Sequence, residues 1–190
     1  MISNISAILM AAGFSRRMGE DKLFMQYQGN ELIEYALALL NDLPVYEKII
    51  VTTAERLEKI VLPSDVRAII NHNPQVGQSE SLRLGVTEAS GEWYLFLNAD
   101  QPRLQTASLQ PMLELTKNNP GKIIHPVANG LPTSPVLFHS RFRADLLSVK
   151  GDVGGREIRK ANAFDCIPFI AENPDDFFDI DTAVDMSIQK

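Results

Sequence analysis

The chain has 190 residues, of which 45% are hydrophobic and 22% are charged, as expected for one soluble globular domain. Its formal net charge of −6 argues against a general nucleic-acid or membrane surface, although a small anionic ligand needs only a local cluster of cations. The apolar stretch at residues 5–12 has no basic segment before it, so a buried strand is favoured over a signal peptide. The single cysteine, Cys166, indicates a packed core residue in a reducing cytoplasm.

Short apolar segments alternate with amphipathic ones along the first half of the chain. The predicted strands are 5–10, 48–52, 66–70 and 93–98, and the predicted helices are 32–40, 54–61, 79–89 and 106–117. Asn30 is a suitable N-cap for the first helix. This alternation predicts an α/β fold with right-handed crossovers and helices on both faces of a mostly parallel sheet.

The second half is less regular, and no linker separates it from the first, so we expect a single domain over residues 1–190. The predicted strands are 122–127, 136–139, 163–170 and 177–180, and the predicted helices are 141–149, 155–161 and 182–190. Thr182 is a suitable cap for the last helix. These elements are expected to extend the sheet.

Two unusual segments, 11–22 and 99–103, each follow a predicted strand directly. Ligands of α/β sheets bind beyond the carboxyl ends of the strands. We therefore expect the two segments to share one crevice.

The first of these segments has the composition of a phosphate-binding loop. The small side chains of Ala11-Ala12-Gly13 let backbone amides approach a ligand closely, and Ser15 adds a hydroxyl group. Arg16, Arg17 and Lys22 supply cations, which with exposed amides suit a triphosphate. Neither the Walker pattern nor GxGxxG is present, so a solvated basic loop remains an alternative.

The same segment, MAAGFSRRMGEDK at residues 10–22, resembles the first loop of the nucleotidyltransferases of molybdenum cofactor biosynthesis, a small-residue turn followed by S/T-x-RMG-x-x-K. The resemblance implies a three-layer α/β/α, Rossmann-like fold, shared with nucleotide-diphospho-sugar transferases. It also implies catalytic roles for Arg16 and Lys22 on the triphosphate. The nucleotide-binding residues implied by this loop are Met10, Ala11, Ala12, Gly13, Ser15, Arg16 and Lys22.

The turn at the start of this loop bears on the choice of base. Its sequence, Met10-Ala11-Ala12-Gly13, is closer to the Leu-Ala-Ala-Gly of cytidylyl transferases than to the Leu-Ala-Gly-Gly of guanylyl transferases. Because the Ala12 methyl takes space that a purine could use, CTP is the expected nucleotide.

Carboxylates stand in two further motifs. Asp100, in Asn98-Ala99-Asp100-Gln101-Pro102, follows a predicted strand, a position that suits a Mg²⁺ ligand. In Asp179-Ile180-Asp181-Thr182, strand alternation would put both aspartates on one face, although Asp181 could instead be an N-cap. The two segments resemble the family's DQP and DIDT motifs, which implies Mg²⁺ as cofactor, Asp100 and Asp181 as its ligands, and a catalytic role for Asp100.

Three more segments resemble family motifs. Gly77-Gln78-Ser79-Glu80-Ser81-Leu82 is similar to G-x-S-x-S-L, which implies that Ser79 and Ser81 line the nucleotide side; Glu80 departs from that pattern. The second segment is similar to the family's G-D-x-G-[AG]-R motif and reads Lys150-Gly151-Asp152-Val153-Gly154-Gly155-Arg156. This similarity implies that Gly151, Asp152 and Arg156 bind the acceptor. A flexible turn is the alternative reading of that segment. Thr133-Ser134-Pro135-Val136 replaces a Gly-His-Pro-Val-like segment, which leaves the identity of the acceptor open.

The resemblance covers nearly the whole chain. It implies that residues 1–105 bind the nucleotide and residues 106–190 the acceptor. The implied reaction transfers CMP from CTP to the phosphate of molybdopterin, the organic part of the molybdenum cofactor, and releases pyrophosphate. A transient contact with a target molybdoenzyme is consistent with such a reaction. Two alternatives stay open: a cytidylyl or uridylyl transferase acting on a sugar or alditol phosphate, and a non-catalytic nucleotide-binding accessory protein for molybdoenzyme maturation.

Overall fold

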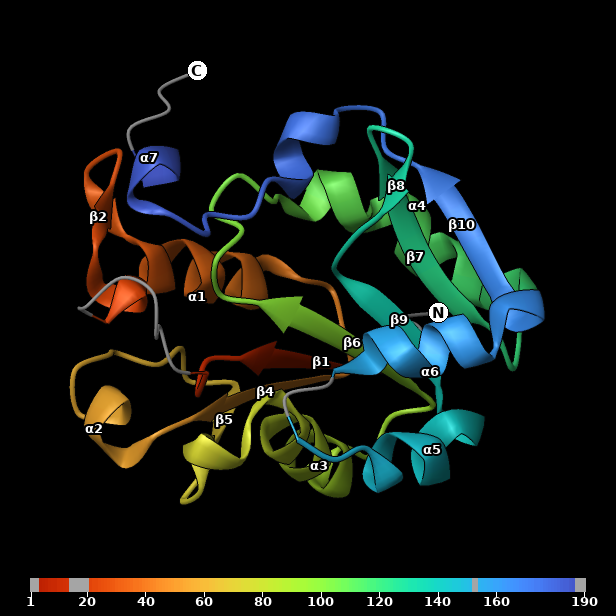
Figure 1. Ribbon diagram of the computed structural model, residues 1–190, viewed down its shortest axis with the longest axis horizontal. Coiled ribbons are helices and arrows are strands. Elements are labelled where there is room, and N and C mark those ends of the chain that lie inside the picture. Colours follow the sequence, from red (N-terminus) through yellow and green to blue (C-terminus); the bar gives the residue numbers. More distant parts are fainter. Residues whose placement is uncertain (1–3, 14–20, 152–153, 187–190) are drawn as a thin grey trace.

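A computed structural model describes residues 4–13, 21–151 and 154–186. Helices cover both faces of one mixed sheet, so the predicted three-layer α/β/α class is confirmed (Figure 1). The strands of this sheet are β1 Ile5–Met10, β4 Glu47–Thr52, β5 Val66–Ile70, β6 Trp93–Asn98, β7 Ile123–Ala128, β8 Leu131–Pro132, β9 Val136–His139 and β10 Cys166–Ile170. A separate pair consists of β2 Gln26–Tyr27 and β3 Asn30–Glu31. The α-helices are α1 Leu32–Asp42, α2 Ala54–Leu57, α3 Gln78–Glu88, α4 Thr106–Leu115, α5 Arg143–Ser148, α6 Gly155–Ala161 and α7 Ala183–Met186.

The strand order β10-β7-β9-β6-β1-β4-β5, with β8 paired to β7, brings distant segments to one edge. β1 pairs in parallel with β4 and with β6, and Met10 is opposite Asn98. The loops after β1 and β6 therefore leave the sheet side by side. β9 is antiparallel to β6 and its first residue, Val136, is opposite Phe96, so the segment before β9 reaches the same edge.

Alternation along the strands separates two apolar layers. Ala7 and Leu9 of β1 belong to the core cluster that includes residues of α1 and α4, while Ile8 belongs to the cluster that includes α3, α5 and α6. Successive side chains of a strand point to opposite faces of the sheet. A strand covered on both faces reads as a continuous apolar run, which is why β1 is recognisable from sequence.

The segment at 177–180 differs from its prediction, because it is not a strand. A 3-10 helix at Pro174–Phe177 precedes it, Phe177 is buried in the main core, and Ile180 is buried in a small cluster with Tyr27 and Leu32. These side chains hold the segment across the carboxyl edge, where the Ile180 amide donates to the Asp100 carbonyl. The strand argument that put Asp179 and Asp181 on one face was therefore wrong.

Other element ends shift by a few residues. The short helix after β4 ends at Leu57, and residues 163–165 form a 3-10 turn before β10. Asn30 lies in β3, and the cap of α1 is Glu31, which forms a capping box with Glu34. The predicted cap Thr182 does accept a hydrogen bond from the Asp185 amide. No helix in the described ranges is long and apolar enough to cross a membrane.

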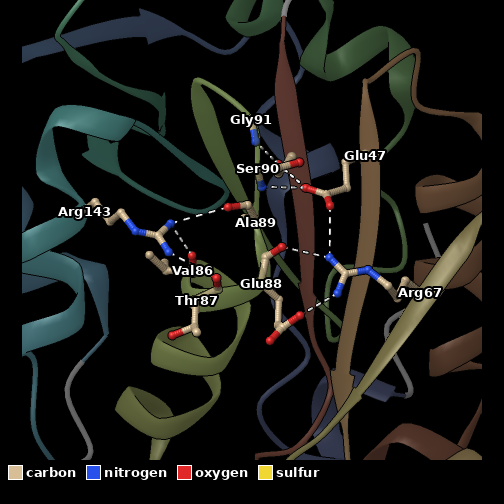
Figure 2. A network of polar contacts seen from close by, with 10 residues as sticks. Glu47, Arg67, Val86, Thr87, Glu88, Ala89, Ser90, Gly91 and Arg143 are labelled. Atoms are coloured by element: carbon tan, nitrogen blue, oxygen red, sulfur yellow. Dashed lines mark hydrogen bonds and ion pairs between the residues drawn. The ribbon is translucent and has the colours of Figure 1, made fainter.

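Two arginines hold the C-terminal end of α3 (Figure 2). Arg143 of α5 donates to the Val86 carbonyl at 2.5 Å. Arg67 of β5 donates to the Glu88 carbonyl at 2.8 Å and pairs with the carboxylates of Glu88 and Glu47. Cations are favourable at this end of a helix, where carbonyls lack partners within the helix. The contacts fix α3 against α5, β4 and β5.

We expect Arg143→Met to lower the free energy of unfolding by about 2 kcal/mol, because it removes charged hydrogen bonds to the α3 carbonyls. Urea denaturation measures this loss. Arg83→Met is the matched control, since the Arg83 side chain pairs with Glu80 on the outside of the same helix and with no other described residue, and its cost should stay below about 1 kcal/mol. Equal losses in the two variants would contradict the role given to Arg143.

Candidate active site

A pocket of about 320 Å³ opens at the carboxyl edge of the sheet. Met10 and Asn98 contribute the ends of β1 and β6, and Gln78 contributes the start of α3. Thr133 lines it from the segment before β9, and Arg156 from α6. Both halves of the chain contribute to its wall, but no described residue of the segments 11–22 and 99–103, which were expected to share a crevice, is among the residues that line it.

Beside this pocket, one ammonium group joins segments from three parts of the chain. Lys22 Nζ donates to Asp100 Oδ2 at 2.8 Å and to the Ile180 carbonyl at 2.6 Å. It also lies 3.9 Å from Asp181 Oδ1. The structure thus brings Lys22, Asp100 and Asp181 together, with the Lys22 side chain directed at the carboxylates.

The oxygen atoms around this contact fit a hard cation. Asp100 Oδ1, Gln101 Oε1 and Asp179 Oδ1 are buried, and none has a hydrogen-bond partner among the residues described. Oxygen-only donors suit Mg²⁺, which usually takes one or two carboxylates and completes its shell with substrate phosphates and water. No group of three or more His, Cys, Asp or Glu residues in the described ranges could hold a metal. A metal held here would therefore share its coordination with the substrate.

Asp179 is a site residue to which sequence reasoning gave no role. Asp179 is among the residues that line the pocket. Burial, together with the neighbouring charges of Asp100 and Asp181, raises the pKa of Asp179 to about 7. The Asp181 side chain, two positions on, is 67% exposed. Because the segment is not a strand, the two carboxylates occupy different environments.

A second residue missed from the sequence is Arg56, which is 7% exposed. Its guanidinium donates to both carboxylate oxygens of Asp21, at 2.6 and 2.9 Å. It also donates to the carbonyls of Ala11 and Gly13, at 2.6 and 2.9 Å. One side chain therefore ties the two ends of the predicted nucleotide loop together. Its position on α2 matches no motif, and only long-range contacts reveal its role.

The described residues at the start of the predicted nucleotide loop differ in their exposure. Met10 lines the pocket, Ala11 and Ala12 are each only 1% exposed, and Gly13 is exposed with nothing within 4 Å of where a Cβ would stand. Ser15 and Arg16 lie outside the described residues.

On α3, the residues that line the pocket are not the two serines that were expected to line the nucleotide side. Ser79 and Ser81 are buried, and the Ser81 hydroxyl accepts a hydrogen bond from Asn71 at 3.0 Å. Gln78 and Leu82 are the residues of α3 that line the pocket.

On the acceptor side, the segment around Gly151 packs against the start of α3, where the Ser79 amide donates to the Gly151 carbonyl at 3.2 Å. Asp152 lies outside the described residues. Arg156 is exposed and lines the pocket. A Cβ on Gly155 would stand 2.8 Å from the Phe138 ring, closer than real Cβ contacts, so glycine lets α6 approach β9.

Gln101 links the two sides of the pocket. This residue is 4% exposed, and its amide nitrogen donates to the carbonyls of Ser134 and Phe177, at 3.1 and 3.3 Å. The altered acceptor segment and the segment that carries Asp179 are thus attached to the residue beside Asp100.

The fold and this edge define the class of protein, an α/β protein with the fold of nucleotidyltransferases. The chain superposes on a nucleotidyl transferase from Methanothermobacter thermautotroptrophicus with a TM-score of 0.77, covering 95% of this chain and 93% of that one at 24% identity. It superposes on Rv0371c from Mycobacterium tuberculosis H37Rv with a TM-score of 0.82, covering 97% and 96% at 16% identity. At these identities the likeness concerns the fold.

The chain belongs to the MobA-like NTP transferase domain family, whose sequence model matches residues 7–166. Among its relatives is a "Probable molybdenum cofactor guanylyltransferase" from Natranaerobius thermophilus, 26% identical over 133 residues. That match covers 68% of this chain and 63% of the relative's length. The resemblance to molybdenum cofactor nucleotidyltransferases is confirmed at the level of the family.

We expect Arg56→Lys to weaken nucleoside triphosphate binding at least about tenfold, because a single ammonium cannot make the four contacts of the guanidinium. Calorimetric titration with CTP and with GTP measures the dissociation constants. Lys59→Met is the control, since Lys59 pairs with Glu55 and lies over the Phe24 ring, and its side chain makes no hydrogen bond to the loop carbonyls in the described residues. Unchanged affinity in Arg56→Lys would show that the ends of the loop do not need this tie.

Proposed function

We propose that this protein is a Mg²⁺-dependent nucleotidyltransferase that transfers CMP from CTP to the phosphate of molybdopterin and releases pyrophosphate. The observation that carries the proposal is the convergence of Lys22, Asp100 and Asp181 at the edge of a pocket that is also lined by Arg156. Membership of the MobA-like NTP transferase domain family supports it.

In the proposed reaction, an oxygen of the acceptor phosphate forms a bond to the α-phosphorus of the nucleotide. The bond from the α-phosphorus to the oxygen that bridges to the β-phosphorus breaks, and pyrophosphate leaves with that oxygen. A phosphate nucleophile is already ionised near neutral pH, so no general base is needed. Rate enhancement then comes from positioning and from neutralising phosphate charge.

The chain's own residues divide this work. Asp100 and Asp181 would hold Mg²⁺, which when bound supplies positive charge to the phosphates. Lys22, fixed by Asp100 and the Ile180 carbonyl, places a further positive charge next to these carboxylates. Arg16 is proposed to contact the triphosphate, and Arg156 the acceptor phosphate. Ser15, Ser79 and Ser81 remain proposed nucleotide-side residues, and Gly151 and Asp152 proposed acceptor-side residues.

The choice of base has two candidates. The likeness of Met10-Ala11-Ala12-Gly13 to the Leu-Ala-Ala-Gly turn of cytidylyl transferases supports CTP. The names of several curated relatives, each a probable molybdenum cofactor guanylyltransferase, support GTP as the second candidate.

Pyrophosphate release with each nucleoside triphosphate, with and without molybdenum-loaded molybdopterin, tests the function. We expect turnover with CTP that requires the pterin, and Ala12→Gly to raise the rate with GTP relative to CTP. Turnover with a sugar or alditol phosphate in place of the pterin would overturn the molybdenum assignment. Nucleotide binding without turnover on any acceptor would favour the accessory-protein alternative.

Asp100→Asn should lower Mg²⁺-dependent pyrophosphate release at least about 100-fold, because it removes charge at the point where phosphate charge must be neutralised. Asp181→Asn is a second variant at an exposed carboxylate, where folding is not at risk. Asp65→Asn is the control, since Asp65 pairs with Lys48 elsewhere on the surface. Thermal denaturation checks folding, and full activity in both site variants would make the metal assignment wrong.

A further inference from the structure

Helix α6 presents two arginines to the pocket. Arg156 and Arg159 both line it, and residues three positions apart lie on the same face of a helix. Arg159 is half-buried and stands outside the G-D-x-G-[AG]-R pattern, which ends at Arg156.

These two arginines differ from the other arginines of the described chain in their partners. Each of the others is held by protein groups: Arg56 by Asp21, Arg67 by Glu47 and Glu88, Arg83 by Glu80, Arg103 by the Tyr27 hydroxyl, Arg141 by Asp165, and Arg143 by backbone carbonyls. The side chains of Arg156 and Arg159 make no hydrogen bond or ion pair with any residue in the described ranges. Two guanidinium groups that have no counter-ion among the described residues thus line the same wall of the pocket.

The surroundings of Arg159 make this arrangement costly. Burial lowers the pKa of Arg159, and the like charge of Arg156 lowers it further. A partly buried charge without a counter-ion is unfavourable, and an arginine that only covers apolar surface would keep its head group in water. The position is explained if an anion enters the pocket.

The other residues that line the pocket indicate the chemistry of the remainder of that ligand. Thr133 and Ser134 offer hydroxyl groups, and Phe96, Val136 and Phe138 add apolar surface. A phosphate group attached to a largely apolar or ring-containing body matches both kinds of lining.

We propose that Arg159, together with Arg156, binds the phosphate group of the acceptor, so that α6 carries a two-arginine phosphate site. The inference rests on the proposed function, whose acceptor is a phosphate monoester, and adds to it the residue that binds this phosphate together with Arg156. Guanidinium groups donate paired hydrogen bonds to phosphate oxygens, and two of them match the two negative charges of a monoester. Charge neutralisation on the acceptor also eases its approach to the triphosphate.

The test measures equilibrium binding to the full chain, separately for molybdopterin, for phenyl phosphate as a simple phosphate monoester, and for CTP. Arg159→Met keeps an unbranched apolar stem and removes the charge. We expect it to weaken binding of both phosphate monoesters at least tenfold and to leave CTP affinity and the melting temperature unchanged. Arg159→Lys should recover part of the lost affinity.

Lys160→Met is the matched control on the next residue, because Lys160 pairs with Glu157 and is 55% exposed. It removes the same charge from the same helix and should change none of the three affinities. Unchanged monoester binding in Arg159→Met, or an equal loss in Lys160→Met, overturns the inference. If phenyl phosphate binding depends on Arg159 while molybdopterin does not bind the wild-type protein, the two-arginine site stands and the proposed acceptor fails.

Discussion

The contact between the Lys22 ammonium and the Asp100 carboxylate is the interaction on which the carboxyl edge of the sheet depends. It joins the segment after the nucleotide loop to the end of β6, and the bond to the Ile180 carbonyl adds a third segment. Asp100, Asp179 and Asp181 stand close enough for their charges to affect one another. Like charges disfavour ionisation of their neighbours, so one cation among them is needed to keep the group together.

Much of this edge could be predicted from the sequence. The continuous apolar runs of β1 and β6 identify buried strands, and a parallel sheet places the residues after them at one edge. Lys22 and Asp100 follow those strands and meet as that geometry requires. The mixed strand order could not be predicted, because the reversal at β9 depends on which edge of the sheet the second half joins.

The residues that sequence reasoning missed act through distant partners. Arg56 is one of two basic residues in a short amphipathic segment, and its role depends on contacts with Asp21, Ala11 and Gly13, which only the folded chain brings to it. Gln101 has the same character. The prediction of a strand at 177–180 was wrong for a related reason. Phe177 and Ile180 are buried in different clusters, and the two-residue alternation of a strand does not predict such an arrangement.

The anchoring of α3 has an electrostatic consequence for the pocket. Arg143 and Arg67 neutralise the partial negative charge at its C-terminal end, and in its first turn Glu80 is compensated by Arg83. The partial positive charge at the other end, where Gln78 meets the pocket, keeps no equivalent counter-charge among the described residues. Seen from the pocket, the helix acts less as a dipole than as a single positive pole. The amides of the first turn of α3 therefore favour an anion at this side of the pocket.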